Sequence, residues 1–246
     1  MPSLDEQLTQ VVAAKAVTTI SDVISVLQDI DSLLPTDDGL KWFNLLYLKV
    51  SESVRDNPPS AGWEAPHWLE RLDVVFANLY FDAIVNWQRN PTQTARSWAP
   101  LFESRRRSDI MRIQFALAGM NAHINHDLPI ALVQVSGEKG VQPDRRSPEY
   151  RDFEYVNNIL EAVEAKIKPY VATGIVGAID ENLGEVDDVI AMWNVRKARE
   201  TAWVNAELLR HLRSAPVQTV RDDFLTNLDR LVGLGSRGLL VPVGLK

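Results

Sequence analysis

The chain has 246 residues, of which 46% are hydrophobic and 24% charged, and its 26 basic and 33 acidic side chains give a formal charge of −7. This is the composition of an ordinary globular protein, and it excludes a disordered chain and a collagen-like repeat. The absence of cysteine excludes disulfides, thiolate nucleophiles and iron–sulfur clusters. The net negative charge argues against nucleic acid as a partner.

The first part of the chain is predicted to form three amphipathic helices. Apolar residues recur every three or four positions along residues 4–17, 20–30 and 40–54. Pro35 should end the second helix, because proline cannot continue a helical hydrogen-bond pattern. Thr36 should cap the third, with two aspartates in its first turn, where negative charge suits the helix dipole.

Two later helices are predicted to lie at the centre of the fold. Residues 67–88 and 110–134 are apolar almost all round, and such helices are usually surrounded by others. We expect them to form a buried antiparallel pair. Pro129 should kink the second helix. Small residues around Gly119 should let the first helix come close to the second.

The second half of the chain is predicted to hold a loop and three further helices. Residues 137–148 contain two glycines and two prolines among charges, which favours an exposed loop or lid. Helices are expected at 153–167, before a proline, and at 186–212 and 220–231, followed by an extended tail. Neither half has its own balanced set of helices, so we expect a single all-α domain, a bundle of about eight helices spanning residues 1–246.

No membrane span is predicted. The first ten residues lack a basic region followed by an apolar run, which argues against a secretory signal. The longest apolar stretches, 72–87 and 113–135, are interrupted by polar side chains. We therefore expect a soluble cytoplasmic protein without a membrane partner.

A polar cluster interrupts the second central helix. At about 100° per residue, His126 lies about 60° to one side of His123, and Asp127 lies about 40° to the other side. Two imidazoles and a carboxylate within one such arc are the ligands that zinc, manganese or non-haem iron would use. The pattern predicts a divalent metal site at these three residues.

The first central helix is expected to complete this site. Asp73 shares a helical face with Phe76 and Tyr80, so its carboxyl group should be buried and should need a partner. We expect Asp73 to be a catalytic base or a ligand, Asp82 to be a further metal ligand, and Tyr80 to line the substrate site.

Three functions fit the cluster. In the leading one, a metal-dependent enzyme, the ion held by His123, His126 and Asp127 activates water or polarises a substrate oxygen. In the second, a metal-free cyclase or isomerase acting on an apolar metabolite, a histidine moves a proton and Asp127 orients it. In the third, a binding or scaffold protein, the buried polar network only fixes the register of the helices.

A second cluster lies in the segment WNVRKARETAW. Arg196 and Glu200 are spaced as an i, i+4 pair, and they could line a cavity for a small molecule, with Trp193 as a wall and Arg196 or Arg199 holding an anionic group. The alternative is a solvated ion pair beside core tryptophans, which is the commoner situation. The chain has no glycine-rich dinucleotide motif and no Walker loop, so no nucleotide cofactor is expected.

Several segments together point to a known family. DGLKWFNLLYLKV, IQFALAGMNAHINHDLPIAL, WNVRKARETAW and LVGLGSRGLLVP resemble, over nearly the whole chain, a bacterial family classed as a domain of unknown function. The most specific part is GMNAHINHDLP. The resemblance implies a single helical domain and adds weight to the histidine cluster, but it implies no reaction.

Overall fold

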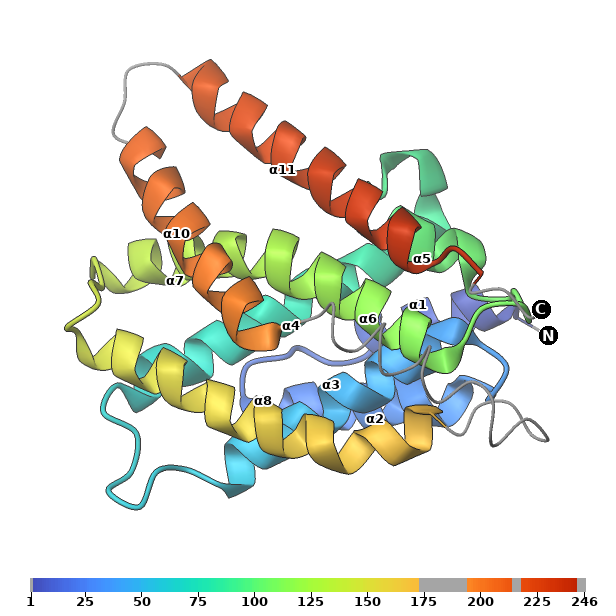
Figure 1. The fold of residues 1–246 in the computed structure, drawn as a ribbon, viewed down its shortest axis with the longest axis horizontal. Coiled ribbons are helices and arrows are strands. Elements are labelled where there is room, and N and C mark those ends of the chain that lie inside the picture. The colour runs from blue at the N-terminus through green and yellow to red at the C-terminus, as the bar shows by residue number, and fades with distance from the viewer. Residues whose placement is uncertain (1, 173–193, 214–217, 243–246) are drawn as a thin grey trace.

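The computed structural model describes residues 2–172, 194–213 and 218–242. Within them the backbone is helical and contains no strand, so the predicted all-α class is confirmed (Figure 1). The helices are α1 (Leu4–Ala13), α2 (Ile20–Leu33), α3 (Gly39–Asp56), α4 (Pro66–Arg89), α5 (Ala99–Ser104), α6 (Arg112–Ala122), α7 (Leu128–Lys139), α8 (Pro148–Ala172), α10 (Val195–Arg213) and α11 (Gln218–Leu239). A 3₁₀ turn follows α4 at Pro91–Gln93, and a π turn joins α6 to α7 at His123–Asp127.

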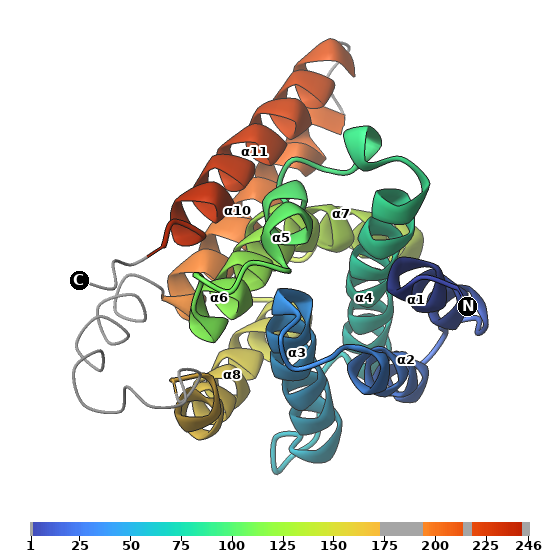
Figure 2. The ribbon, with the colours of Figure 1, turned by 90° about the vertical axis from the view of Figure 1, so that its right-hand side faces the viewer.

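The segment from α6 through the π turn to α7 forms the middle of the bundle. On one side, α3 packs along α6 and α4 packs along α7. On the other side, α11 contacts α6 and α10 contacts α7, so two layers of helices enclose the middle segment (Figure 2). α8 contacts α3 and α4, while α1 and α2 also pack against α4.

The helix predicted at 110–134 is interrupted by the π turn. Pro129 has no backbone N–H, so the carbonyl of Asn125, four residues earlier, lacks its α-helical donor. The backbone N–H of Leu128 bonds instead to the carbonyl of His123, five residues earlier. This bond places one extra residue in the turn, a distortion that often occurs at functional sites. Pro129 therefore changes the helix type of the preceding turn from α to π, where a kink was expected.

The small residues of α6 do admit a close neighbour, but this neighbour is α3. A Cβ atom added to Gly119 would lie 2.3 Å from Cγ of Phe43, so only glycine allows this contact. α4 contacts α7 and the π turn, which is the part of the predicted central pairing that the structure confirms. The expected close approach of α4 to Gly119 is wrong.

α3 begins later than expected. Its N-cap is Asp38, whose carboxylate accepts a hydrogen bond of 3.0 Å from the backbone N–H of Leu40, and the predicted cap Thr36 is not used. Asp38 is buried, and the guanidinium group of Arg105 forms an ion pair with it at 2.6 Å. The pairing with Arg105 favours Asp38 over the competing cap residue.

The first part of the tail expected to be extended is helical, since α11 continues to Leu239; residues 240–242 follow outside the helix, and Val243 lies outside the described residues. A Cβ atom on Gly233 would lie 2.3 Å from the carbonyl oxygen of Arg96, so this glycine lets α11 pack directly against the main chain. The side-chain amide of Asn121 donates to the carbonyl of Val232 at 2.9 Å. These contacts with the rest of the bundle support a helix that contains three glycines.

Other boundaries differ in smaller ways. α8 continues past Pro169, because a proline in the last turn removes only one main-chain hydrogen bond. α7 extends into the predicted loop 137–148 and leaves only residues 140–147 outside the helices. The early part of the helix predicted at 186–212 lies outside the described residues, and its later part is α10.

Candidate functional site

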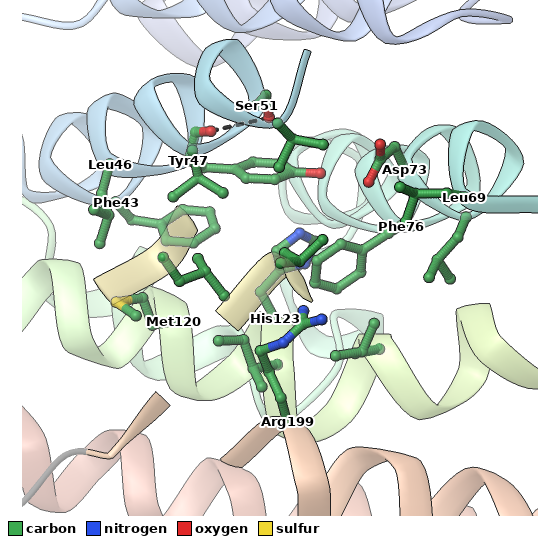
Figure 3. Close-up of a pocket in the computed structure, with 17 residues that line it drawn as sticks. Phe43, Leu46, Tyr47, Ser51, Leu69, Asp73, Phe76, Met120, His123 and Arg199 are labelled. Atoms are coloured by element: carbon green, nitrogen blue, oxygen red, sulfur yellow. Dashed lines mark hydrogen bonds between the residues drawn. The ribbon is translucent and has the colours of Figure 1, made fainter. Parts of the chain in front are cut away.

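A cavity lies between α3, α4, the π turn, α8 and α10. It has a volume of about 730 Å³, including the space at its open mouth, and its walls are mostly aliphatic and aromatic (Figure 3). Polar side chains among the residues that line it are Tyr47, Ser51, Asp73, His123 and Arg199. A mostly apolar cavity with a few converging polar groups is the usual form of a small-molecule site.

His123 is the buried polar residue that the π turn brings to this cavity. The side chain is almost fully buried, and its ring stacks on Phe76 with centroids 3.5 Å apart and planes within 6°. The ring of Tyr47 lies edge-on at 4.7 Å. Nδ1 of His123 lies 3.0 Å from Oδ2 of Asp127, whereas the buried Nε2 has no hydrogen-bond partner in the described part of the chain. A potential proton acceptor therefore remains unused.

Asp127 holds both histidines in place. Its Oδ1 lies 2.7 Å from Nδ1 of His126, and its Oδ2 accepts a second hydrogen bond from Nε1 of Trp98 at 2.9 Å. Burial alone would raise the pKa of Asp127, but the hydrogen bonds from His123 and His126 lower it below its usual value. An ionised carboxylate only accepts hydrogen bonds, so each histidine carries a proton on Nδ1.

The two histidines differ in charge. Burial lowers the pKa of His123 and outweighs the effect of Asp127, so His123 is neutral with a free electron pair on Nε2. Burial also opposes protonation of His126, but Asp127 and Asp229 together raise its pKa above the usual value. Nε2 of His126 lies 3.6 Å from Oδ1 of Asp229 on α11. The two carboxylates therefore favour the cationic form of His126.

Asp73 brings a second titratable group to the cavity. Its half-buried carboxyl group makes no hydrogen bond and no ion pair with any described residue. Burial raises its pKa to about 7, although the charge of Arg199 lowers it and that of Glu70 raises it further. The structure thus places the predicted residues Asp73 and His123 on the same cavity, and both forms of Asp73 are present near neutral pH.

The side chains around Asp127 that were predicted to bind a metal ion form a hydrogen-bonded network. Both carboxylate oxygens of Asp127 already accept from ring N–H groups, and Nε2 of His126 faces Asp229. Asp82 is exposed on α4. Across the described ranges, no three His, Asp or Glu side chains are grouped so that they could hold a metal ion. The metal site stays a prediction.

The predicted Arg196–Glu200 cluster is arranged differently from the expectation. Arg196 bonds to Glu161 on α8 at 3.0 Å, and Glu200 accepts a hydrogen bond of 3.0 Å from the hydroxyl of Tyr150, so the two are not paired with each other. Neither lines the cavity. Arg199, one turn further along than Arg196, does line it.

One other expected substrate residue, Tyr80, lies away from the cavity. Tyr80 is fully buried, donates to Oδ1 of Asn44 at 3.4 Å and stacks on Trp98, so it belongs to the core. It is not among the residues that line the cavity. Trp193 lies outside the described residues.

A family model matches residues 20–242, nearly the whole chain. The chain belongs to DUF5995, a family of unknown function. The resemblance seen in the sequence is therefore confirmed, and DUF5995 membership carries no reaction with it. No curated protein and no solved structure gave a significant match. In the described part of the DUF5995 chain, the helices are too short or too polar to cross a membrane.

Sequence reasoning did not find several residues of this DUF5995 site. Tyr47 has the spacing of an ordinary core residue on α3, and Trp98 comes from the segment before α5. Asp229 lies 103 positions after His126, as the difference between the two numbers shows. Their roles depend on how distant helices pack, and no local pattern carries this information.

Asp73 should make the stability of the protein depend on pH. A carboxyl group with a raised pKa binds more protons in the folded chain, so stability falls as pH rises from about 4, the unfolded value, to about 7. Asp73→Asn removes this unfavourable charge. The variant should be more stable than the wild type at pH 8, by about 1 kcal/mol or more, and the gain should shrink at pH 5.

Urea unfolding at both pH values measures this effect. The charges of Arg199 on α10 and Glu70 on the same helix act on Asp73, and Tyr47 on α3 and His123 in the π turn line the same cavity. Asp82→Asn, an exposed change on the same helix, is the control: burial raises the pKa of Asp82 less than that of Asp73, so the effect should be clearly smaller. A loss of stability in Asp73→Asn that is equal at pH 5 and pH 8 would contradict the burial of this charge.

Proposed function

We propose that this chain is an acid–base enzyme that moves a proton on an apolar small molecule, as an isomerase or cyclase does. The observation that carries the proposal is Nε2 of neutral His123, which has no partner among the described residues, is buried at a mostly apolar cavity, and belongs to a ring held by Asp127 through Nδ1. A base held in this way by a carboxylate is the usual arrangement for proton abstraction by histidine.

The residues divide the chemistry between them. Nε2 of His123 accepts a proton from the substrate, and Asp127 stabilises the imidazolium that forms because its carboxylate remains bonded to Nδ1. Protonated Asp73 donates a proton to another atom of the same molecule, which its pKa of about 7 permits near neutral pH. The proton then returns from His123 to Asp73, and the enzyme is unchanged at the end of the cycle.

The aromatic walls support this role. Phe76 covers one face of the imidazole, and Tyr47 lies against its edge, so the ring cannot turn away from the cavity. Both side chains also keep water from the base, and a base in an apolar site has no hydration shell to lose when it meets a C–H bond. The site is therefore organised before a substrate enters.

A chromogenic probe tests the base directly. Opening of the ring of 5-nitrobenzisoxazole needs one base: the C–H proton is removed, its electron pair forms the nitrile, the N–O bond breaks and a coloured phenolate leaves. Wild-type protein should accelerate this reaction, and His123→Gln should lower the rate constant about ten-fold or more. Glutamine can still donate an N–H to Asp127, so the network is preserved while the base is lost.

His67→Gln is the matched control, because His67 is exposed at the start of α4 and lies away from the cavity. This variant should keep the wild-type rate constant. Equal rate constants in wild type and His123→Gln, with both proteins folded by circular dichroism, would refute the assignment of His123 as a base. That result would favour the binding or scaffold function considered above.

A further inference from the structure

Arg199 is a cation at the cavity, and within the part of the chain that the structure describes it has no ion-pair partner. The residue is only 6% exposed, and among the described residues that line the cavity it is the one cationic side chain, since His123 is neutral. Its Nε donates to Oδ1 of Asn157 at 2.7 Å, and its Nη2 donates to the carbonyl of Phe153 at 2.7 Å. The guanidinium carbon lies 4.0 Å from the centre of the Phe153 ring. These contacts fix the orientation of the group but bring no negative charge.

The carboxylates of Glu154 and Asp73 act on Arg199 from a distance, but neither forms an ion pair with it. Glu154, one turn before Asn157 on α8, accepts a hydrogen bond from that amide at 3.1 Å and lies 3.5 Å from Nη1 of Arg196. Asp73 faces the cavity from α4 (Figure 3), but within the described ranges neither it nor any other carboxylate forms an ion pair with Arg199. Nη1 of Arg199 makes no hydrogen bond to the described residues.

A buried charge without a counterion is unfavourable. Removing a guanidinium group from water costs several kcal/mol unless an anion replaces the lost solvation. Burial lowers the pKa of Arg199 to about 10, so the group remains charged at neutral pH. Because the remaining walls are mostly apolar, a bound molecule is the natural source of the missing negative charge.

We infer that the cavity binds an apolar carboxylic acid, whose carboxylate pairs with Arg199 and whose hydrocarbon part lies along Leu69, Phe76 and Leu160. This inference rests on the proposed function and names the class of its substrate. Arg199 is the single cation at the cavity, and Asp73 lies on another wall, so the cavity suits a ligand with a single negative charge. A phosphate group with two charges would need further donors.

Calorimetry with two probes of nearly equal shape tests the inference. Octanoate and octanamide share the same hydrocarbon chain, but only octanoate is charged. Wild-type full-length protein should bind octanoate at least ten-fold more tightly than octanamide. Arg199→Met, which keeps the apolar volume, should abolish this preference. Arg196→Met, one turn earlier on α10 and paired at the surface with Glu161, should preserve it.

The outcomes separate this inference from the proposed function. Equal affinity of the wild type for octanoate and octanamide, or no binding of octanoate, overturns the carboxylate assignment even if Arg199→Met fails to fold. Octanoate should also inhibit the His123-dependent opening of 5-nitrobenzisoxazole competitively. A reaction that depends on His123 but is insensitive to octanoate would leave the base in place and remove only the assigned substrate class.

Discussion

Arg105→Ala is expected to lower the free energy of unfolding by about 3–5 kcal/mol, because the change leaves the carboxylate of Asp38 buried without its cation. Nε and Nη2 of Arg105 both donate to Asp38, at 2.8 and 2.6 Å, and both side chains are almost fully buried. Nη1 donates to Asp5 on α1 at 2.9 Å. The backbone carbonyl of Arg105 also accepts from the N–H of Gly39 at 2.6 Å. One residue therefore joins α1, the start of α3 and the segment after α5.

Urea unfolding at neutral pH measures this loss, with the midpoint falling and the slope unchanged. Arg107→Ala is the matched control two residues further along, since Arg107 pairs with Asp109 at the exposed surface. That change should have little effect on stability. If both variants lost the same free energy, the ion pair between Arg105 and Asp38 would not be a main support of the fold.

Asp127→Ala is expected to cost about 3 kcal/mol or more, because three buried N–H donors lose their acceptor together. They are Nε1 of Trp98 and the Nδ1 groups of His123 and His126. The cationic form of His126 also loses one of its two carboxylates. The pKa of His126 should therefore fall in the variant, which NMR titration of its ring protons would record.

Asp127→Asn removes the negative charge of the side chain but keeps its shape. The amide keeps the size of the side chain and one oxygen acceptor, so its effect on unfolding should lie between those of the wild type and Asp127→Ala. Asp82→Ala, a carboxylate removed from an exposed position on α4, is the control and should change stability little. An Asp127→Ala variant as stable as this control would show that the three donors find other partners.

The pH dependence of this network has opposing parts. His126 has a raised pKa in the folded chain. Its contribution to the free energy of unfolding is therefore complete below about pH 6.5, and it is lost as pH rises through the pKa of the folded state. His123 and Asp127 have lowered pKa values, so the stability that they contribute is lost as pH falls. The loss begins below about pH 6.5 for His123 and below about pH 4 for Asp127.

Local patterns were sufficient for most of the helices. α2 begins at Ile20 and α4 ends at Arg89, each within a residue of the sequence prediction, because apolar periodicity and proline act over a few residues. Thr36 and Asp38 are both good N-caps, and the choice between them depends on Arg105, 67 positions away from Asp38. Such a choice is invisible to local reasoning.

The candidate site was predictable in its residues but less so in its geometry. His123, His126 and Asp127 do form one buried cluster, as their spacing indicates. The direction in which each ring nitrogen points depends on the π turn and on Trp98, which comes from a distant segment. For the same reason, the sequence could not decide between Arg196 and Arg199, since the cavity wall is set by how α10 packs.

The π turn also has a consequence for how this protein can change. An α-helix rotates each following residue by about 100°, so deleting the extra residue of the turn would rotate α7 by about that angle relative to α6. α6 faces α3 and α11, while α7 faces α4 and α10, so such a deletion would misalign one half of the bundle against the other. Substitutions around the cavity can alter its specificity one residue at a time, but the length of the segment that carries His123 cannot change without refitting the entire bundle.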